Sequence, residues 1–313
     1  MGAIETARAA EARTTDDSAR HLLGYGLAVT AASLWAIGGV IAKLAFARGI
    51  APAELAQVRI ALGFLMFATI VAIWRPHSAR VRRGHLPLLV AFGVIGMAGV
   101  QLSYYEAIRR LPVVLALLIQ YLGPLFVLVY AWLRGRTVGG RLWVAALLTL
   151  VGSYFALGAY DASLLDLNLE GALIALLSAV IFAFYLIVGE RIVRAYSALT
   201  LLLYGFGIAA LSWTVVRPWW TLPYDRWDAT TYVLIVGVAI VGTLLPFFLS
   251  STALSLLPAT RVGLAETMEP VVAGVAAFVV LGESLAGLQL VGAALVLGGI
   301  ALARSVQPTI DGV

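Results

Sequence analysis

Two stretches of similar design decide the fold: LPVVLALLIQYLGPLFVLVYAWL at residues 111–133 and LPATRVGLAETMEPVVAGVAAFVV at residues 257–280. Each begins with Leu-Pro and has a second proline near its middle. A helix needs about 20 apolar residues to cross the hydrocarbon core of a bilayer. Both stretches therefore predict a membrane-spanning helix that is interrupted near its centre.

The match between the two stretches extends along the chain at one offset of 146 residues. The paired features are Gly96 with Gly242, Ala107 with Ala253, Leu111-Pro112 with Leu257-Pro258, Pro124 with Pro270, Leu142 with Leu288, and Gly152 with Gly298. The chain has only 11 prolines, so two proline pairs at one offset indicate an internal repeat.

Apolar runs of membrane-spanning length make up most of the 313 residues, of which 62% are hydrophobic and 12% charged. Soluble domains carry about 25% charged residues, so a soluble enzyme or a nucleic-acid-binding protein is excluded. No run alternates between apolar and polar residues as an outer-membrane barrel strand does. The expected spans are 22–45, 53–74, 86–108, 113–132, 142–159, 170–189, 198–216, 230–253, 262–281 and 286–303.

The repeat and the number of spans together predict the architecture. Five spans per copy is an odd number, so the second copy enters the membrane in the opposite sense. We expect an all-α integral membrane protein with ten transmembrane helices in two inverted five-helix repeats, residues 21–159 and 160–304. We expect residues 1–20 to form a disordered cytoplasmic tail and residues 305–313 a second cytoplasmic tail.

The basic residues predict the orientation. Most of the 21 Lys and Arg residues fall in segments on one side, including RPHSARVRRGH at 75–85, and basic segments stay in the cytoplasm. This places both termini of a multi-pass protein in the cytoplasm, and we assign these charges no nucleic-acid role.

Several kinds of chemistry have no residues to support them. The chain has no cysteine, and His21, His77 and His85 lie outside the long apolar runs. A metal site, a bound cofactor and histidine- or cysteine-based catalysis are therefore not expected. No phosphate-binding glycine motif is present, so no ATP-driven step and no ATPase subunit is implied. The expected partners are a small-molecule substrate and membrane lipid, and an enzyme is the least favoured class.

Prolines and acidic residues inside the spans are candidates for gating and coupling. Pro124, Pro246 and Pro270 are gating or kink candidates, because a mid-span proline leaves a carbonyl without its donor; a simple packing kink is the alternative. The possible proton-coupling residues are Glu266, Glu269 and Glu106; a structural role for Glu269 beside the kink remains open. We expect Arg59 to pair with an acid, with Glu106 as a candidate.

Uncharged polar and aromatic side chains inside the spans are the substrate-binding candidates. Neutral amides and hydroxyls can bind a zwitterion without the cost of a buried charge, and aromatic rings can wall a cavity. The alternative is packing between helices. The candidates are Trp35, Gln101, Tyr104, Tyr105, Gln120, Tyr121, Phe182 and Tyr185.

The segment EPVVAGVAAFVVLGES at 269–284, preceded by LP-x-x-x-x-G-L-A at 257–265, resembles EamA-type members of the drug/metabolite transporter superfamily. The resemblance extends over about residues 22–304 and is strongest to exporters of aromatic and other amino acids of the YddG type. It implies ten helices, two inverted halves, a bacterial inner-membrane location and export of small metabolites. A departure is Arg136-Thr137 where the second half has Gly282-Glu283.

The predicted function is secondary export of small metabolites by alternating access, most of all amino acids including aromatic ones. An exporter of drugs or other polar metabolites is the alternative within the superfamily. A membrane scaffold or receptor that transports nothing is a more distant one. Both proton-coupled antiport and facilitated diffusion are compatible with these residues.

Overall fold

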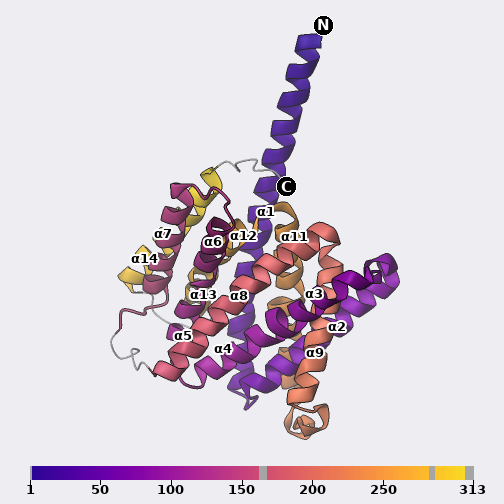
Figure 1. Ribbon diagram of the computed structural model, residues 1–313. Coiled ribbons are helices and arrows are strands. Elements are labelled where there is room, and N and C mark those ends of the chain that lie inside the picture. Colours follow the sequence, from indigo (N-terminus) through magenta and orange to yellow (C-terminus); the bar gives the residue numbers. More distant parts are fainter. Residues whose placement is uncertain (1, 162–167, 282–285, 307–313) are drawn as a thin grey trace.

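The computed structural model describes residues 2–161, 168–281 and 286–306, and these residues form helices and connecting turns without a strand (Figure 1). Nine of the described helical segments are long and apolar enough to cross a membrane. A tenth, Gly140–Ala156, is shorter. The prediction of an all-α membrane protein is confirmed, and each helical segment coincides with one of the ten expected runs.

Six spans are single helices. Span 1 lies in α1 (Gly2–Phe46), span 2 is α2 (Pro52–Trp74), span 5 is α7 (Gly140–Ala156), span 6 is α8 (Leu169–Ala195), span 7 is α9 (Ala198–Val216) and span 10 is α14 (Gly287–Ser305). Short 3-10 turns lie in the connections, at η1 (Pro76–Ala79), η2 (Arg83–His85), η5 (Trp219–Thr221) and η6 (Tyr224–Arg226).

Four spans are built from shorter pieces, and they are the third and fourth of each repeat. Span 3 contains α3 (Leu86–Ala91), η3 (Phe92–Gly99) and α4 (Val100–Ile108), and span 8 contains α10 (Ala229–Ala239), η7 (Ile240–Leu244) and α11 (Leu245–Leu256). Span 4 contains α5 (Val113–Gln120) and α6 (Gly123–Leu133), and span 9 contains α12 (Ala259–Glu266), α13 (Glu269–Ala276) and η8 (Ala277–Leu281). The segments η3, η7 and η8 are π-helical, a form that often occurs at functional sites.

The residues expected to form a disordered N-terminal tail are part of helix α1, and the separate tail stays a prediction. Helix α1 begins at Gly2, and its first part extends beyond the bundle in Figure 1. Residues 2–13 are rich in Ala, Glu and Arg, which have high helix propensity, so the segment continues span 1 as helix. The expected C-terminal tail lies largely outside the described residues, and the cytoplasmic location of both ends stays a prediction.

The two repeats meet along α7 and α14, which lie side by side (Figure 1). A Cβ atom on Gly152 would lie 2.8 Å from the carbonyl oxygen of Gly292, and one on Gly299 would lie 2.9 Å from that of Ala145. Residue numbers rise along one helix as they fall along the other, so the helices are antiparallel.

These two contacts are also copies of each other. At these helices the offset between the repeats is 147 residues, one more than the 146 found from the sequence, so Gly152 corresponds to Gly299 and not to Gly298, and Ala145 corresponds to Gly292. A twofold axis that exchanges the two helices therefore carries the first contact onto the second. The equivalent helices α7 and α14 are thus related by a pseudo-twofold axis, and the repeats are inverted.

Gly152→Ala should disturb this interface, because the added methyl group meets the backbone of α14 at 2.7 Å from the amide nitrogen of Val296. We expect unfolding in detergent to require about 1–3 kcal/mol less free energy than in the wild type, the usual cost of overpacking. Gly298→Ala is the matched control, since a Cβ there meets nothing within 4 Å. Equal stability of the two variants would contradict the interface.

Candidate substrate site

Spans 4 and 9 are both broken at the same place in their repeats. Helix α5 ends at Gln120 and α6 begins at Gly123, while α12 ends at Glu266 and α13 begins at Glu269. The offset of 146 residues superimposes Gln120 on Glu266 and Gly123 on Glu269. Each break leaves backbone groups with partial charges at membrane depth, which transporters use to bind charged substrates.

The prolines lie at the starts of the new helices. Pro124 and Pro246 occupy the first turn of α6 and α11, and Pro270 is the second residue of α13. A proline in this position needs no backbone donor and has the φ angle of a helix. The prolines thus mark where helices restart, and their part in gating stays a prediction.

A serine from another span forms a hydrogen bond with the polar side chain that ends the helix before each break. The Gln120 amide donates a hydrogen bond to Ser178 Oγ at 2.9 Å, and Ser250 Oγ donates one to Glu266 Oε1 at 2.5 Å. Both serines are fully buried. They come from span 6 and span 8, so each break in the membrane is held by a polar contact to another span.

Several buried polar atoms around these breaks have no hydrogen-bond partner among the described residues. They include Tyr121 Oη, Tyr185 Oη, Ser251 Oγ and Glu266 Oε2. More than nine in ten buried polar groups in proteins are hydrogen-bonded, so unsatisfied atoms gathered near one place need a reason. A polar ligand or water would satisfy them.

Arg59 of span 2 and Glu269 of span 9 are half-buried, and neither forms an ion pair within 4.0 Å with a described residue. The Nε atom of Arg59 is buried without a hydrogen-bond partner among the described residues. Charged side chains inside membrane spans are rare and mark functional sites, so both residues stay candidates.

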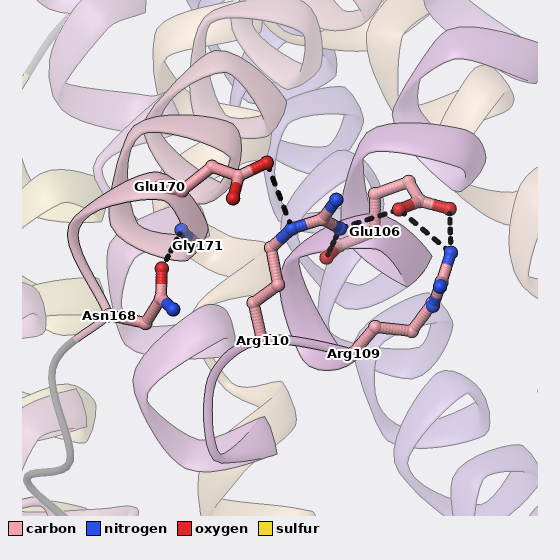
Figure 2. A network of polar contacts seen from close by, with 6 residues as sticks. All are labelled: Glu106, Arg109, Arg110, Asn168, Glu170 and Gly171. Carbon is pink, nitrogen blue, oxygen red and sulfur yellow. Dashed lines mark hydrogen bonds and ion pairs between the residues drawn. The ribbon is translucent and has the colours of Figure 1, made fainter.

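The expected pairing of Arg59 with Glu106 is wrong. Figure 2 shows that the Glu106 carboxylate contacts Arg109 at 2.8 Å and Arg110 at 2.6 Å, one turn further along the chain. Arg110 also reaches Glu170 at 3.1 Å, which ties the end of span 3 to the start of span 6. Asn168 caps α8 beside it by accepting a hydrogen bond from the Gly171 amide at 3.0 Å. Glu106 thus belongs to a network at the bundle end, apart from Glu266 and Glu269.

The aromatic candidates form one connected cluster. Phe182 and Tyr185 of span 6 are stacked with ring centroids 6.0 Å apart. Phe247 of span 8 joins them to Trp35 of span 1, with centroid distances of 6.1 Å to Tyr185 and 5.2 Å to Trp35. The sequence analysis missed Phe247, although its place directly after Pro246 is a usable signal. The predicted aromatic walls thus come from both repeats.

The remaining candidates of span 3 diverge. The Tyr105 ring contacts that of Trp213 in span 7, with ring centroids 6.5 Å apart, and packs against the main hydrophobic core, and its part in substrate binding stays a prediction. Gln101 is half-buried and makes no hydrogen bond to a described residue. The Tyr104 ring contacts that of Tyr105, with ring centroids 5.9 Å apart.

Glu190, which sequence reasoning also missed, supports span 9 from span 6. This buried carboxylate accepts a hydrogen bond from the amide of Ala259 at 2.8 Å and pairs with Arg194 at 2.6 Å. It satisfies an amide in the first turn of α12, where helix amides lack internal partners. It therefore positions the half-helix that carries Glu266.

A surface groove lies apart from the buried polar residues described above. A groove of about 570 Å³ lies between α2 and α9 and is lined mainly by apolar residues such as Leu62, Phe64 and Leu211, without any of the candidate substrate residues. Within the described ranges, no group of three or more His, Cys, Asp or Glu residues could hold a metal ion.

Comparison with known proteins agrees with this arrangement. The EamA-like transporter family matches residues 22–158 and, a second time, residues 169–305. The threonine/homoserine exporter RhtA of Escherichia coli (strain K12) is 32% identical over 276 residues, which are 87% of this chain and 86% of RhtA.

More distant relatives agree in fold or family. The uncharacterized transporter YcbK of Bacillus subtilis (strain 168) is 25% identical over 257 residues, which are 80% of this chain and 82% of YcbK. A solved crystal structure is similar with a TM-score of 0.75 and 22% identity, over 94% of this chain and 99% of that one. The repeats, the broken spans and these relatives lead to one conclusion: the chain belongs to the EamA-like transporter family of the drug/metabolite transporter superfamily.

Proposed function

We propose that this chain is a secondary exporter of amino acids that works by alternating access between its two inverted repeats. The observation that carries the proposal is the pair of spans that are broken at equivalent places in the two repeats, each with a buried polar contact to another span. Membership of a transporter family supports transport as the activity, and we propose no catalytic role.

Among amino acids, we place small hydroxylated ones first. The relatives with about a third of their residues in common are exporters of threonine and homoserine. Aromatic amino acids, which the sequence also suggested, remain second candidates because the aromatic cluster of Trp35, Phe247 and Tyr185 already has rings in mutual contact. We further propose the bacterial inner membrane as the location, with both termini in the cytoplasm.

The substrate is tested by counterflow in liposomes that contain the purified protein. Liposomes loaded with unlabelled threonine or homoserine should take up labelled threonine in a saturable way, and loading with phenylalanine should give less uptake. Protein-free liposomes are the control. Uptake no higher than in that control, by protein that unfolds cooperatively on heating, would refute amino-acid transport.

Proton coupling is a separate part of the proposal, and Glu266 is its best placed residue. Its carboxyl is 3% exposed and bonded through only one oxygen, to Ser250, whereas Glu106 is held by two arginines. A pH gradient, acidic inside, should drive threonine accumulation by the wild type. Glu266→Gln should keep counterflow and lose this accumulation, and the control Glu106→Gln should keep both. Accumulation by Glu266→Gln equal to that of the wild type would contradict the assignment.

A further inference from the structure

A hollow of about 180 Å³ lies at one end of the bundle, between the start of span 3 and the end of span 6. Helix α8 packs against η3 and α4 of span 3, whereas α3 packs against α9 instead, so spans 3 and 6 separate at this end. No candidate substrate residue lines the hollow. Its lining includes His85, Leu88, Leu89, Arg191, Ile192 and Tyr196.

The floor of the hollow is apolar and its rim is polar. Leu89 and Ile192 are buried, whereas Arg191 is exposed. Leu89 also lies about one helical turn, or roughly 5 Å, further into span 3 than His85, which precedes α3. A phospholipid has the same order of groups, with a charged phosphate at the membrane surface and apolar chains beneath it.

Hydrogen bonds hold the polar rim in place. The hydroxyl of Tyr196 accepts a hydrogen bond from the backbone amide of Arg82 at 3.1 Å and lies 2.7 Å from Nδ1 of His85. The rings of His85 and Tyr196 also meet edge to face, with centroids 5.6 Å apart. Tyr196 belongs to the second repeat and the other two residues to the first, so the rim joins the two repeats.

The charges beside the hollow are unbalanced. Arg191 forms no ion pair within 4.0 Å with a described residue. Its neighbour Glu190 is already paired with Arg194, at 2.6 Å. The segment that leads into span 3, residues 75–85, contains no acidic residue and four exposed arginines: Arg75, Arg80, Arg82 and Arg83. An anion from outside the chain would balance this positive charge.

The equivalent place in the other half, at the end of span 1 and the start of span 8, is closed. Ala45 and Ile235 are buried there in one hydrophobic cluster. Arg48 pairs beside them with Asp228, at 2.9 Å. The offset of 146 residues places Arg82 at the position of Asp228, so an acid of the closed end is replaced by an arginine at the hollow. Packing of the helices therefore does not require an open, basic hollow.

We propose that this hollow binds the phosphate group of an anionic phospholipid such as phosphatidylglycerol, with Arg191 against the phosphate and Leu89 and Ile192 against the first carbons of the acyl chains. Basic pockets between transmembrane helices are suited to anionic lipid headgroups. At about 30 Å³ for each water molecule, the hollow has the volume of about six waters, which suits a headgroup phosphate and not a whole lipid. The bound lipid contacts both repeats, and its binding does not depend on the proposed substrate.

Lipid binding is measured on the purified full-length protein in a neutral detergent by native mass spectrometry. Dioctanoyl phosphatidylglycerol is the anionic probe, and dioctanoyl phosphatidylcholine has the same chains without a net charge. Glycerol 3-phosphate is a soluble probe that has the phosphate without the chains. We expect the wild type to bind phosphatidylglycerol most tightly, because only this probe matches both Arg191 and the apolar floor.

Arg191→Gln should weaken phosphatidylglycerol binding about fivefold, the contribution of one arginine beside an anionic lipid, and leave phosphatidylcholine binding unchanged. Arg191→Lys keeps the charge and should keep the preference for phosphatidylglycerol. Arg136→Gln is the matched control, since Arg136 is also exposed but does not line the hollow. It lies just beyond the end of span 4, which is on the same side of the bundle as the end of span 6, and it should bind both lipids as the wild type does.

Equal phosphatidylglycerol binding by Arg191→Gln and Arg136→Gln would overturn the site, and so would a wild type that binds the two lipids equally. Binding of glycerol 3-phosphate as tight as that of phosphatidylglycerol would show that the occupant is a soluble anion and would overturn the lipid assignment. Because the substituted residues are exposed, the variants should unfold in detergent at the same temperature as the wild type.

Discussion

The close antiparallel packing of α7 against α14 is the contact on which the architecture depends. Lipid tails are as apolar as leucine, so helices in a membrane associate through close packing and not through the hydrophobic effect. Gly152, Gly292 and Gly299 allow the two backbones to approach at this interface. Because each contact is repeated by its equivalent residues, the same surface joins two halves of opposite orientation.

Spans 4 and 9 are broken at equivalent places because the two repeats are copies of each other. The residues at the two breaks nevertheless differ. The first break is lined by Gln120 and closed by the contact between Gly123 and Phe182. The second carries Glu266 and Glu269, which end one half-helix and begin the next. The two repeats thus share the same helix arrangement, but the polar residues at their breaks differ. The repeats also differ at the end of the bundle, where Glu106 and Arg110 form an ion pair. The offset of 146 residues places Thr252 and Leu256 at the equivalent positions, so this ion pair has no counterpart in the second repeat.

The sequence predicted the spans well because hydrophobic length alone sets them. Proline pairs located both breaks, since a proline must sit where a helix starts or stops. The π-helical segments could not be foreseen, because the residues of η3 and η7 are ordinary apolar residues and glycine, and packing decides their winding.

The candidate site was predicted in part. Trp35, Phe182 and Tyr185 were found because aromatic residues recur at equivalent places in the two repeats, whereas Phe247, which connects them, has no aromatic counterpart and could have been found only from its place after Pro246. The partner of Glu106 could have been found from Arg109 and Arg110, which follow it at helical spacing. The contact between Gln120 and Ser178 joins residues 58 positions apart in the chain, so only the folded arrangement of spans 4 and 6 reveals it.

The most direct test of the inverted repeat uses the absence of native cysteine. Arg109 and Ser255 are exposed and equivalent at the offset of 146 residues. Single-cysteine variants Arg109→Cys and Ser255→Cys are treated in intact cells with a thiol reagent that cannot cross the membrane. The account predicts labelling of the first and labelling of the second only after the cells are opened. Labelling of both from the same side would contradict it.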